Sequence, residues 1–381
     1  MTRNQFLALI AILAALAVAG AGVFWLQRAD WNASNSKVGE KLIPGLVVSE
    51  VEKIRIVEAG ETVTLNRVDG KWQVAERDGY PAHIDRIAEF LAKLAELKIT
   101  QLEPLAESQR ARLQLVEPKG AQSKDAGVLV ELEGAAGKQL GRLLLGKRVV
   151  MQAQTTAPSK GAAQPSGRYV VTGSDTANMA VILDPLSNAE AKPGPWLFRD
   201  LIRVSGAKAM QWSSGSGRPG WSVVRESETT DWRFADSGEK LDNNKVQDLV
   251  SVLLYIALGD VVTDKTKGNF DKGATLKVQS FDGLGYTIRL GDLEWDNRYV
   301  KVALSGEPPK VRVPGKGETA EEKEKLDKTF EENRKAHMLG LERERKLEPW
   351  TFLVPNSNIE ALSRDRTQIL PGAKKEEPKK P

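Results

Sequence analysis

The sequence has no cysteine and only two histidines, His83 and His337, among its 381 residues. The absence of cysteine excludes disulfide bonds, thiolate nucleophiles, cysteine-bound zinc or iron–sulfur clusters and a lipidated N-terminal cysteine. Two histidines so far apart in the chain do not form a metal-binding motif. We therefore expect neither a bound metal nor a cofactor.

An excess of charge of one sign is also missing, because 55 basic residues are balanced by 51 acidic ones for a net charge of +4. Nucleic-acid binders need a concentrated basic face, so we expect no nucleic-acid partner. The apolar fraction of 41% and the charged fraction of 28% are typical of a globular protein. The length suits about two domains of roughly 150 residues each.

One long uncharged stretch, 21 residues from Phe6 to Leu26, stands near the start of the chain. As a helix it would be about 30 Å long, which is the thickness of the hydrocarbon core of a bilayer. We interpret residues 1–30 as a transmembrane anchor and residues 31–46 as a linker. The alternative is a cleaved signal peptide with Ala17-Val18-Ala19 as its cleavage site. Since long domains are translocated largely regardless of their charge, we place the bulk of the chain outside the cytoplasm.

The rest of the chain repeats one pattern. Residues 51–76 and 202–236 each show apolar alternation broken by turn-forming residues, which predicts short strands. An apolar stripe with helical spacing follows each of them, over 84–94 and over 246–256. We expect Pro81 in the first turn of the first helix and Asp242 as the N-cap of the second. Further pairs follow in the same order: Gly146 with Gly291, Arg168-Tyr169-Val170 with Arg298-Tyr299-Val300, Pro185 to Ala191 with Pro355 to Ala361, and Leu197 to Asp200 with Leu362 to Asp365.

This repetition predicts the fold class. We expect an α+β protein in which an N-terminal transmembrane helix precedes two tandem modules, residues 47–200 and 201–370. Each module is expected to hold a mostly antiparallel sheet with one main helix. Residues 371–381 read as a disordered charged tail.

The second module carries an insertion, residues 305–349, that the first lacks. Within it, 18 of the 31 residues from Glu318 to Glu348 are charged, and Thr319 with Glu322 forms a capping-box pattern. The insertion predicts a projecting charged helix or a helical hairpin. A thin stripe on this segment is our candidate partner-binding face: Leu326, Phe330, His337 and Leu341.

No stretch of the sequence predicts catalysis. Gly141 to Lys147 match the spacing of a phosphate-binding loop but lack its Ser/Thr, and three leucines favour a strand. The sequence of residues 213–220 is typical of a hairpin turn. His83 is interpreted as a surface or capping residue at the start of the first helix. The acidic run around Trp295 also favours a hairpin turn over a cation or glycan site. We find no serine acyl-enzyme motif and predict that the protein is not an enzyme.

The strand motifs resemble the bacterial domain-of-unknown-function family 4340. The resemblance extends over nearly all of residues 50–370, and its motifs are structural patterns of moderate specificity. It implies an anchored protein of the bacterial inner membrane, with most of the chain in the periplasm. It also implies a genetic context of ABC transporters related to gliding-motility export systems, and it supplies no catalytic residue. The residues that carry it are Gly70-Lys71-Trp72, Leu143 to Gly146, Arg168-Tyr169-Val170, Ile288 to Gly291 and Arg298-Tyr299-Val300.

Three functional hypotheses follow from these patterns. The leading one is a non-enzymatic accessory or scaffolding protein that contacts the membrane and an envelope protein, with ABC transporter subunits as candidate partners. The second is a module that binds an envelope glycan or peptide, for which exposed tryptophans such as Trp221 or Trp295 would line a groove. The third is a hydrolase that uses two carboxylates brought together by the fold.

Overall fold

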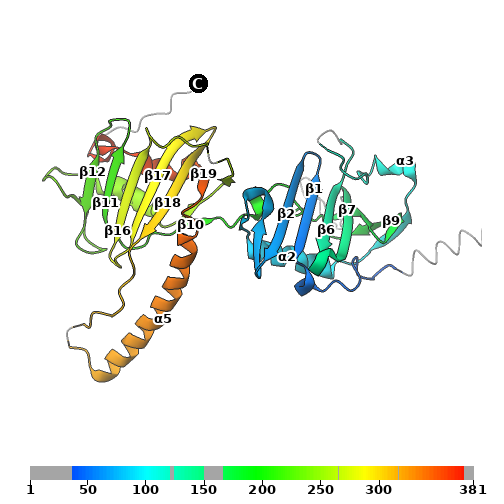
Figure 1. Ribbon diagram of the computed structural model, residues 1–381, viewed down its shortest axis with the longest axis horizontal. Helices are drawn as coiled ribbons and strands as arrows, with labels where there is room; N and C mark the ends of the chain where they lie inside the picture. The colour runs from blue at the N-terminus through cyan, green and yellow to red at the C-terminus, as the bar shows by residue number, and fades with distance from the viewer. Residues whose placement is uncertain (1–36, 121–123, 150–165, 265, 316, 373–381) are drawn as a thin grey trace, which may run out of the picture. The chain divides into compact units, whose positions relative to one another are not determined.

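The computed structural model describes residues 37–120, 124–149, 166–264, 266–315 and 317–372. The chain divides into two compact units, the first ending at Leu197 and the second beginning at Phe198. Figure 1 shows a broad sheet in each unit.

The first unit is built on a nine-stranded antiparallel sheet with the order β4-β3-β2-β1-β6-β7-β8-β9-β5. Helix α2 (Ile84–Glu96) is its main helix, and α3 (Glu107–Arg110) is a single turn. The strands are β1 (Lys53–Glu58), β2 (Glu61–Val68), β3 (Lys71–Val74), β4 (Tyr80–Pro81), β5 (Gln101–Pro104), β6 (Val128–Glu133), β7 (Gln139–Val149), β8 (Gly167–Thr172) and β9 (Asp175–Ile182).

The core of this unit follows from the alternation seen in the sequence. Ile54 and Ile56 of β1 are fully buried and lie opposite Leu65 and Val63 of β2. Helix α2 buries Ile87, Phe90, Leu91 and Leu94, whereas Ile84 at its start is 58% exposed. Phe90 packs edge-to-face on Trp196, with the ring centroids 5.5 Å apart. A second cluster of buried apolar residues, from Leu105 to Met179 in the sequence, includes side chains of β6, β7, β8 and β9.

The start of α2 confirms one prediction and corrects another. His83 is the N-cap, and its Nδ1 accepts a hydrogen bond from the backbone N–H of Arg86 at 3.3 Å. This is the helix-start role expected of that histidine. Pro81, which the sequence also suggested for the first turn, instead ends β4, where it pairs with Gln73. A proline is tolerated there because β4 lies at the edge of the sheet.

The second unit contains an eight-stranded antiparallel sheet with the order β13-β12-β11-β16-β17-β18-β19-β15, and a two-stranded sheet of β10 and β14. Its helices are α4 (Asn243–Leu253), α5 (Ala320–Arg345) and the short α6 (Asn356–Ile359). The strands are β10 (Asp200–Ile202), β11 (Ala207–Ser214), β12 (Trp221–Val224), β13 (Arg233–Phe234), β14 (Ile256–Ala257), β15 (Asp260–Val262), β16 (Ala274–Ser280), β17 (Gly285–Glu294), β18 (Asn297–Ser305) and β19 (Thr351–Pro355).

The two large sheets share one strand order, except that the first sheet has one more strand, β4, at its edge. In each, an N-terminal meander forms one side and a later meander, β6 to β9 or β16 to β19, forms the other. The first strands of the two meanders pair with each other, β1 with β6 in the first unit and β11 with β16 in the second. In each unit a strand between the helix and the later meander, β5 or β15, pairs with the last strand of that unit.

The predicted fold class is wrong. The described chain is sheet-rich, with three antiparallel sheets and few helices, rather than an α+β protein headed by a transmembrane helix. The physical reason is that most apolar residues recur with the period of a strand and therefore form sheets. The helical pattern is confined to short segments, since α2 and α4 have only 13 and 11 residues.

The predicted membrane span, Phe6 to Leu26, lies outside the described residues. Within the ranges that the structure describes, no helix is both long enough and apolar enough to cross a membrane. Residues 373–381 of the predicted tail also lie outside them.

One arginine in each unit joins the motifs that recur in the sequence. Arg168 of β8 is 6% exposed, and its Nε donates to the carbonyl oxygen of Gly146 at 2.8 Å. Its Nη1 donates to the carbonyl oxygens of Pro185 and Leu186, at 3.2 and 3.4 Å. Burial lowers the pKa of Arg168 to about 10, so the group is still charged at neutral pH. The carbonyl oxygens therefore compensate a buried positive charge.

Arg298 of β18 occupies the matching place in the second unit. Its Nη1 donates to the carbonyl oxygen of Gly291 at 2.9 Å, and its Nε donates to Oδ1 of Asn356 at 2.9 Å. In both units the strand that holds the glycine has an irregular register beside the strand that holds the arginine. The recurring glycine, arginine and proline motifs are thus parts of one hydrogen-bonded arrangement.

Candidate functional site

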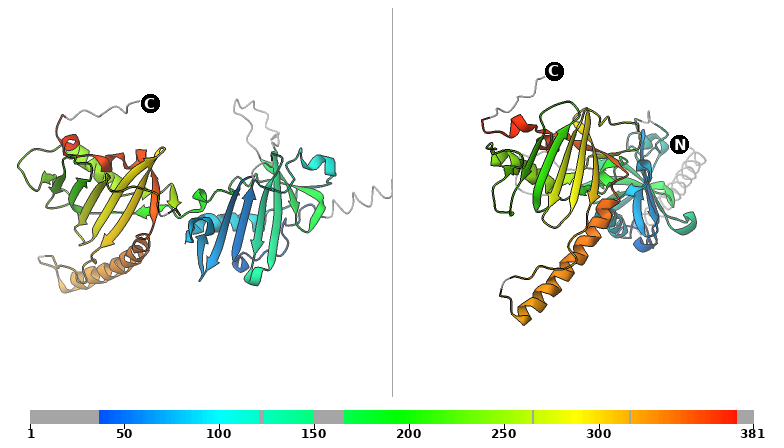
Figure 2. Two further views of the ribbon diagram at one scale, coloured as in Figure 1. Left: turned by 45° about the horizontal axis from the view of Figure 1, so that its top comes forward. Right: turned by 60° about the vertical axis from the view of Figure 1, so that its left-hand side comes forward.

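Helix α5 is the feature that distinguishes the second unit from the first. It begins with a capping box, in which the side chains of Thr319 and Glu322 each accept from the other's backbone N–H, as the sequence predicted. It is one helix of 26 residues and not a helical hairpin. Its C-terminal end lies on the sheet, where Leu341 is 2% exposed, and its N-terminal part extends away from the sheet (Figures 1 and 2).

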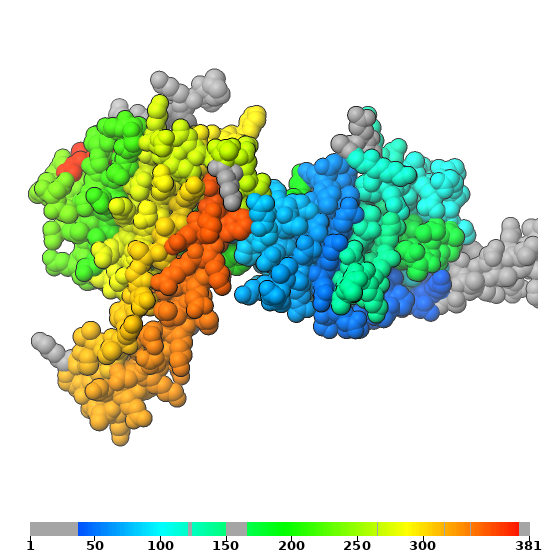
Figure 3. Space-filling view, viewed as in Figure 1, coloured from blue at the N-terminus to red at the C-terminus, as the bar shows by residue number. Residues whose placement is uncertain are grey.

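The outer part of α5 is tied to the loop that leads into it. Arg312 donates from Nη1 and Nη2 to the two carboxylate oxygens of Glu318, at 2.7 and 2.6 Å, and from Nε to Oδ1 of Asp327 at 2.8 Å. Such a forked contact is geometrically specific as well as charge-assisted. It fixes the loop against the first turns of the helix, and together they form the protrusion seen in Figure 3.

This ion cluster predicts a pH dependence. The hydrogen bonds from Arg312 and from the N–H of Gly315 lower the pKa of Glu318 from 4.5 to about 2. Since the folded pKa lies below the unfolded one, the contact stabilises the loop above pH 4.5 and is lost as the pH falls toward 2. We expect a carboxyl-carbon NMR titration of Glu318 to show its midpoint near the lower value. Arg312→Gln should return the midpoint toward the ordinary value, and an unchanged midpoint in that variant would contradict the assignment.

The four residues predicted as a partner face do not lie on one accessible surface. Leu341 is buried against the sheet, and the Nε2 of His337 lies 3.7 Å from Oδ2 of Asp282. Leu326 is 44% exposed on the outer part of the helix, and Phe330 is partly exposed there. The structure therefore divides the set into two residues at the base of α5 and two on its outer part.

Two exposed apolar residues near the outer part were not identified from the sequence. Val311 and Val313 flank Arg312 in the loop and are 78% and 88% exposed. Because Arg312 binds Asp327 of the helix, these valines are held beside the outer part of α5. We call Val311, Val313, Leu326 and Phe330 the tip residues. A signal for the valines was available, since an isolated V-R-V lies between prolines 309 and 314 inside a highly charged insertion.

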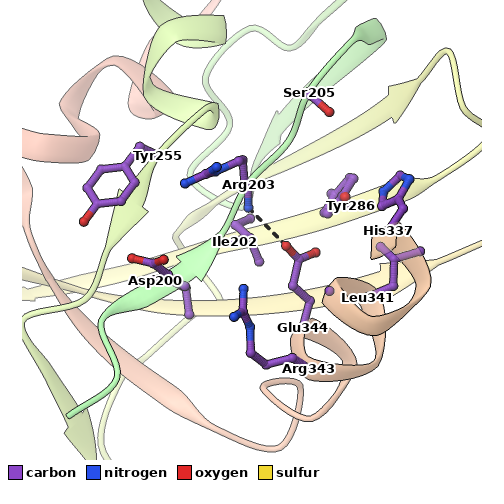
Figure 4. Close-up of a pocket in the computed structure, with 12 residues that line it drawn as sticks. Asp200, Ile202, Arg203, Ser205, Tyr255, Tyr286, His337, Leu341, Arg343 and Glu344 are labelled. Carbon is purple, nitrogen blue, oxygen red and sulfur yellow. Dashed lines mark hydrogen bonds between the residues drawn. The ribbon is translucent and has the colours of Figure 1, made fainter. Parts of the chain in front are cut away.

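A pocket of about 330 Å³ with both polar and apolar walls lies at the base of α5. Its walls are β10 with the residues just after it, Tyr255, Tyr286 of β17, and one side of α5 from His337 to Glu344. Figure 4 shows Glu344 facing the backbone of Arg203, with Tyr286 and His337 near Leu341. Sequence reasoning reached His337 and Leu341 but not the rest, because the other walls are far away in the chain.

Glu344 is the most unusual group of this pocket. Its Oε1 accepts a hydrogen bond from the N–H of Arg203 at 3.3 Å, whereas its Oε2 is buried and has no hydrogen-bond partner among the described residues. Burial raises the pKa of Glu344. Burial, together with the charge of Glu344, also raises the pKa of Tyr286, which is 4% exposed. A carboxylate oxygen in this position calls for a proton or a hydrogen-bond donor.

The other sequence motifs have structural roles. Residues 141–147 lie within β7, as the strand interpretation predicted. Residues 213 and 214 end β11, and residues 215–220 connect it to β12. Trp295 occupies the turn between β17 and β18 and is 92% exposed, whereas Trp221 is buried and donates from Nε1 to the carbonyl oxygen of Arg364. The two tryptophans therefore do not line one groove. Among the described residues, no group of three or more histidine or acidic side chains could hold a metal ion.

Comparison with known proteins gives one family. The family model described as "Domain of unknown function (DUF4340)" matches residues 72–273, which is more than half of the chain. The match confirms the family that the strand motifs resemble, but it covers residues 72–273 rather than nearly all of residues 50–370. No curated protein and no solved structure gives a significant match. This chain belongs to the DUF4340 family.

Proposed function

We propose that this protein is a non-enzymatic accessory component of a bacterial envelope complex that acts by binding another protein. The proposed partner is a membrane protein, with ABC transporter subunits as the first candidates. The apolar stretch near its N terminus is proposed to hold the chain at the inner membrane, with the two sheet units on the periplasmic side.

The observation that carries the proposal is the tip of α5. The helix extends from its sheet, and its outer part is accompanied by the loop that the Arg312 cluster ties to it. Apolar side chains are exposed there within a strongly charged segment, with Val313 at 88% and Leu326 at 44%. Apolar residues surrounded by charges on a fixed protrusion are typical of a protein contact surface.

The proposal is tested with the full chain expressed in its native cells. We expect the wild-type protein to fractionate with membranes and, after mild detergent extraction, to retain transporter subunits. Leu326→Glu should reduce the retained amount about fivefold or more, because a buried apolar contact would be replaced by a charge. Leu339→Glu is the matched control, since Leu339 lies on the same helix and is 70% exposed.

Three outcomes would contradict the proposal. The chain could remain in the soluble fraction with its first residues still attached. It could retain no membrane protein. Equal retention by the Leu326→Glu and Leu339→Glu variants would show that the tip residues are not the contact surface.

A binding module for a glycan or peptide is a second candidate function. It is favoured by Trp295, whose ring is exposed beside Asp296 in a turn with φ of 56°, a conformation that is uncommon for a residue other than glycine. The buried Trp221 counts against a tryptophan-lined groove. The carboxylate hydrolase remains the third, since Asp200 and Glu344 line one pocket.

A further inference from the structure

The pocket at the base of α5 has features of a small-molecule site that the proposed partner contact does not explain. Its volume of about 330 Å³ is at the lower end of the range of ligand pockets, roughly 300–1,000 Å³. It is lined by groups of both charge signs: the carboxylates of Asp200 and Glu344 and the guanidinium groups of Arg203 and Arg343. A ligand with charges of both signs is complementary to such a site.

The inner part of the pocket requires a donor. Oε2 of Glu344 is buried and has no partner among the described residues, although Oε1 of the same carboxylate accepts from the N–H of Arg203. The walls on this side are apolar, since Ile202 and Leu341 are 5% and 2% exposed. In such surroundings a buried carboxylate oxygen gains most from a positively charged N–H donor.

The outer part of the pocket offers positive charge. Arg203 and Arg343 are exposed, and neither guanidinium group takes part in an ion pair or hydrogen bond among the described residues, although both positive charges oppose the rise in the pKa of Glu344. The Arg343 guanidinium lies 4.7 Å from the ring centroid of Phe198, a cation–π contact that leaves its N–H groups available. Guanidinium groups in this state suit a carboxylate, which they can bind through two parallel hydrogen bonds.

We propose that this pocket binds a small zwitterion of the amino-acid or dipeptide class. The ammonium group of the ligand donates to the carboxylate of Glu344, and the carboxylate of the ligand lies between Arg203 and Arg343. This site is separate from the tip residues, so it does not depend on the proposed partner contact.

Isothermal titration calorimetry on the full chain in detergent tests the proposal with four defined probes. We expect L-alanine and the dipeptide Ala-Ala to bind with dissociation constants of about 1 mM or tighter. N-acetyl-alanine lacks the ammonium group and alanine amide lacks the carboxylate, so each should bind at least about tenfold more weakly. This comparison uses the unaltered protein, so it does not depend on the folding of any variant.

Glu344→Gln keeps the size of the side chain and its acceptor for the N–H of Arg203, but it removes the negative charge. We expect it to weaken Ala-Ala binding at least about tenfold. Glu342→Gln, on an exposed position of the same helix, should change the binding less than about twofold.

Several results would overturn the proposal. They are no heat of binding with either zwitterion, equal binding of N-acetyl-alanine and alanine, or unchanged affinity in the Glu344→Gln variant. Cleavage of Ala-Ala during the titration would show that the pocket hydrolyses the dipeptide, which would also contradict the proposed binding site. None of these results bears on partner capture through Leu326, so the two proposals fail separately.

Discussion

Replacing Arg168 with methionine is expected to lower the free energy of unfolding of the first unit by about 3 kcal/mol. Methionine fills similar space but donates no hydrogen bond. The carbonyl oxygens of Gly146, Pro185 and Leu186 would lose their donor in a place where the arginine is 6% exposed. Each buried acceptor left without a partner costs about 1–3 kcal/mol, and relaxation recovers part of the sum.

Hydrogen exchange with mass spectrometry on the full chain measures this effect, because it reports on each unit separately. Arg168→Met should speed exchange throughout β7 and β8, while the second unit is unchanged. Arg298→Met should speed exchange in the second unit and leave the first unit unchanged. The effect should be smaller, since Arg298 is less buried than Arg168. Arg112→Met, at an exposed position of the first unit, is the control and should change nothing. Unchanged protection in β7 of the Arg168→Met variant would refute the role given to this arginine.

Replacing Gly273 with alanine is expected to destabilise the second unit by about 3 kcal/mol. A Cβ at this position would lie 1.8 Å from the carbonyl oxygen of Leu290, which is backbone of the neighbouring strand β17. Backbone in the middle of a paired sheet cannot move away as a flexible side chain can. The pairing of β16 with β17 therefore has to open at this end, and the hydrogen bond from the N–H of Gly215 to Gly273 is lost with it.

Gly238→Ala is a stringent control for that variant. Gly238 is in the same unit, and a Cβ there meets nothing within 4 Å. We expect thermal unfolding of the full chain to show a lower transition for Gly273→Ala only, by roughly 6 °C or more. If both alanine variants melt like the wild type, the close approach of Gly273 to Leu290 is not present in solution.

Local elements were well predicted where a few neighbouring residues decide them. The stripe over 84–94 is α2, Asp242 caps α4 through the N–H of Asn244, and Thr319 with Glu322 caps α5. These features depend on the spacing of side chains along one turn or two of backbone, which the sequence shows directly. The predicted fold class was wrong because the prediction treated two short helices as equal in importance to two large sheets.

The candidate sites were only partly predictable. The stripe from Leu326 to Leu341 was read as one face, but the helix lies on its sheet at one end and leaves it at the other, so Leu341 is buried and Leu326 is exposed. Glu344 gave no signal, because its unusual surroundings come from Arg203 and Tyr286, which precede it by many residues. Sequence spacing cannot reveal a pocket whose walls meet only in the folded chain.

The sequence by itself determined which chemistry is absent and which motifs recur. The lack of cysteine, the balanced charge and the repeated glycine and arginine patterns are properties of composition and order, so they can be read without a fold. Only the tertiary structure decided that Arg168 and Arg298 reach the carbonyl oxygens of the recurring glycines, and that a carboxylate oxygen of Glu344 is buried without a donor. The physical reason is that burial and hydrogen-bond partners depend on contacts between distant segments, and antiparallel sheets bring such segments together.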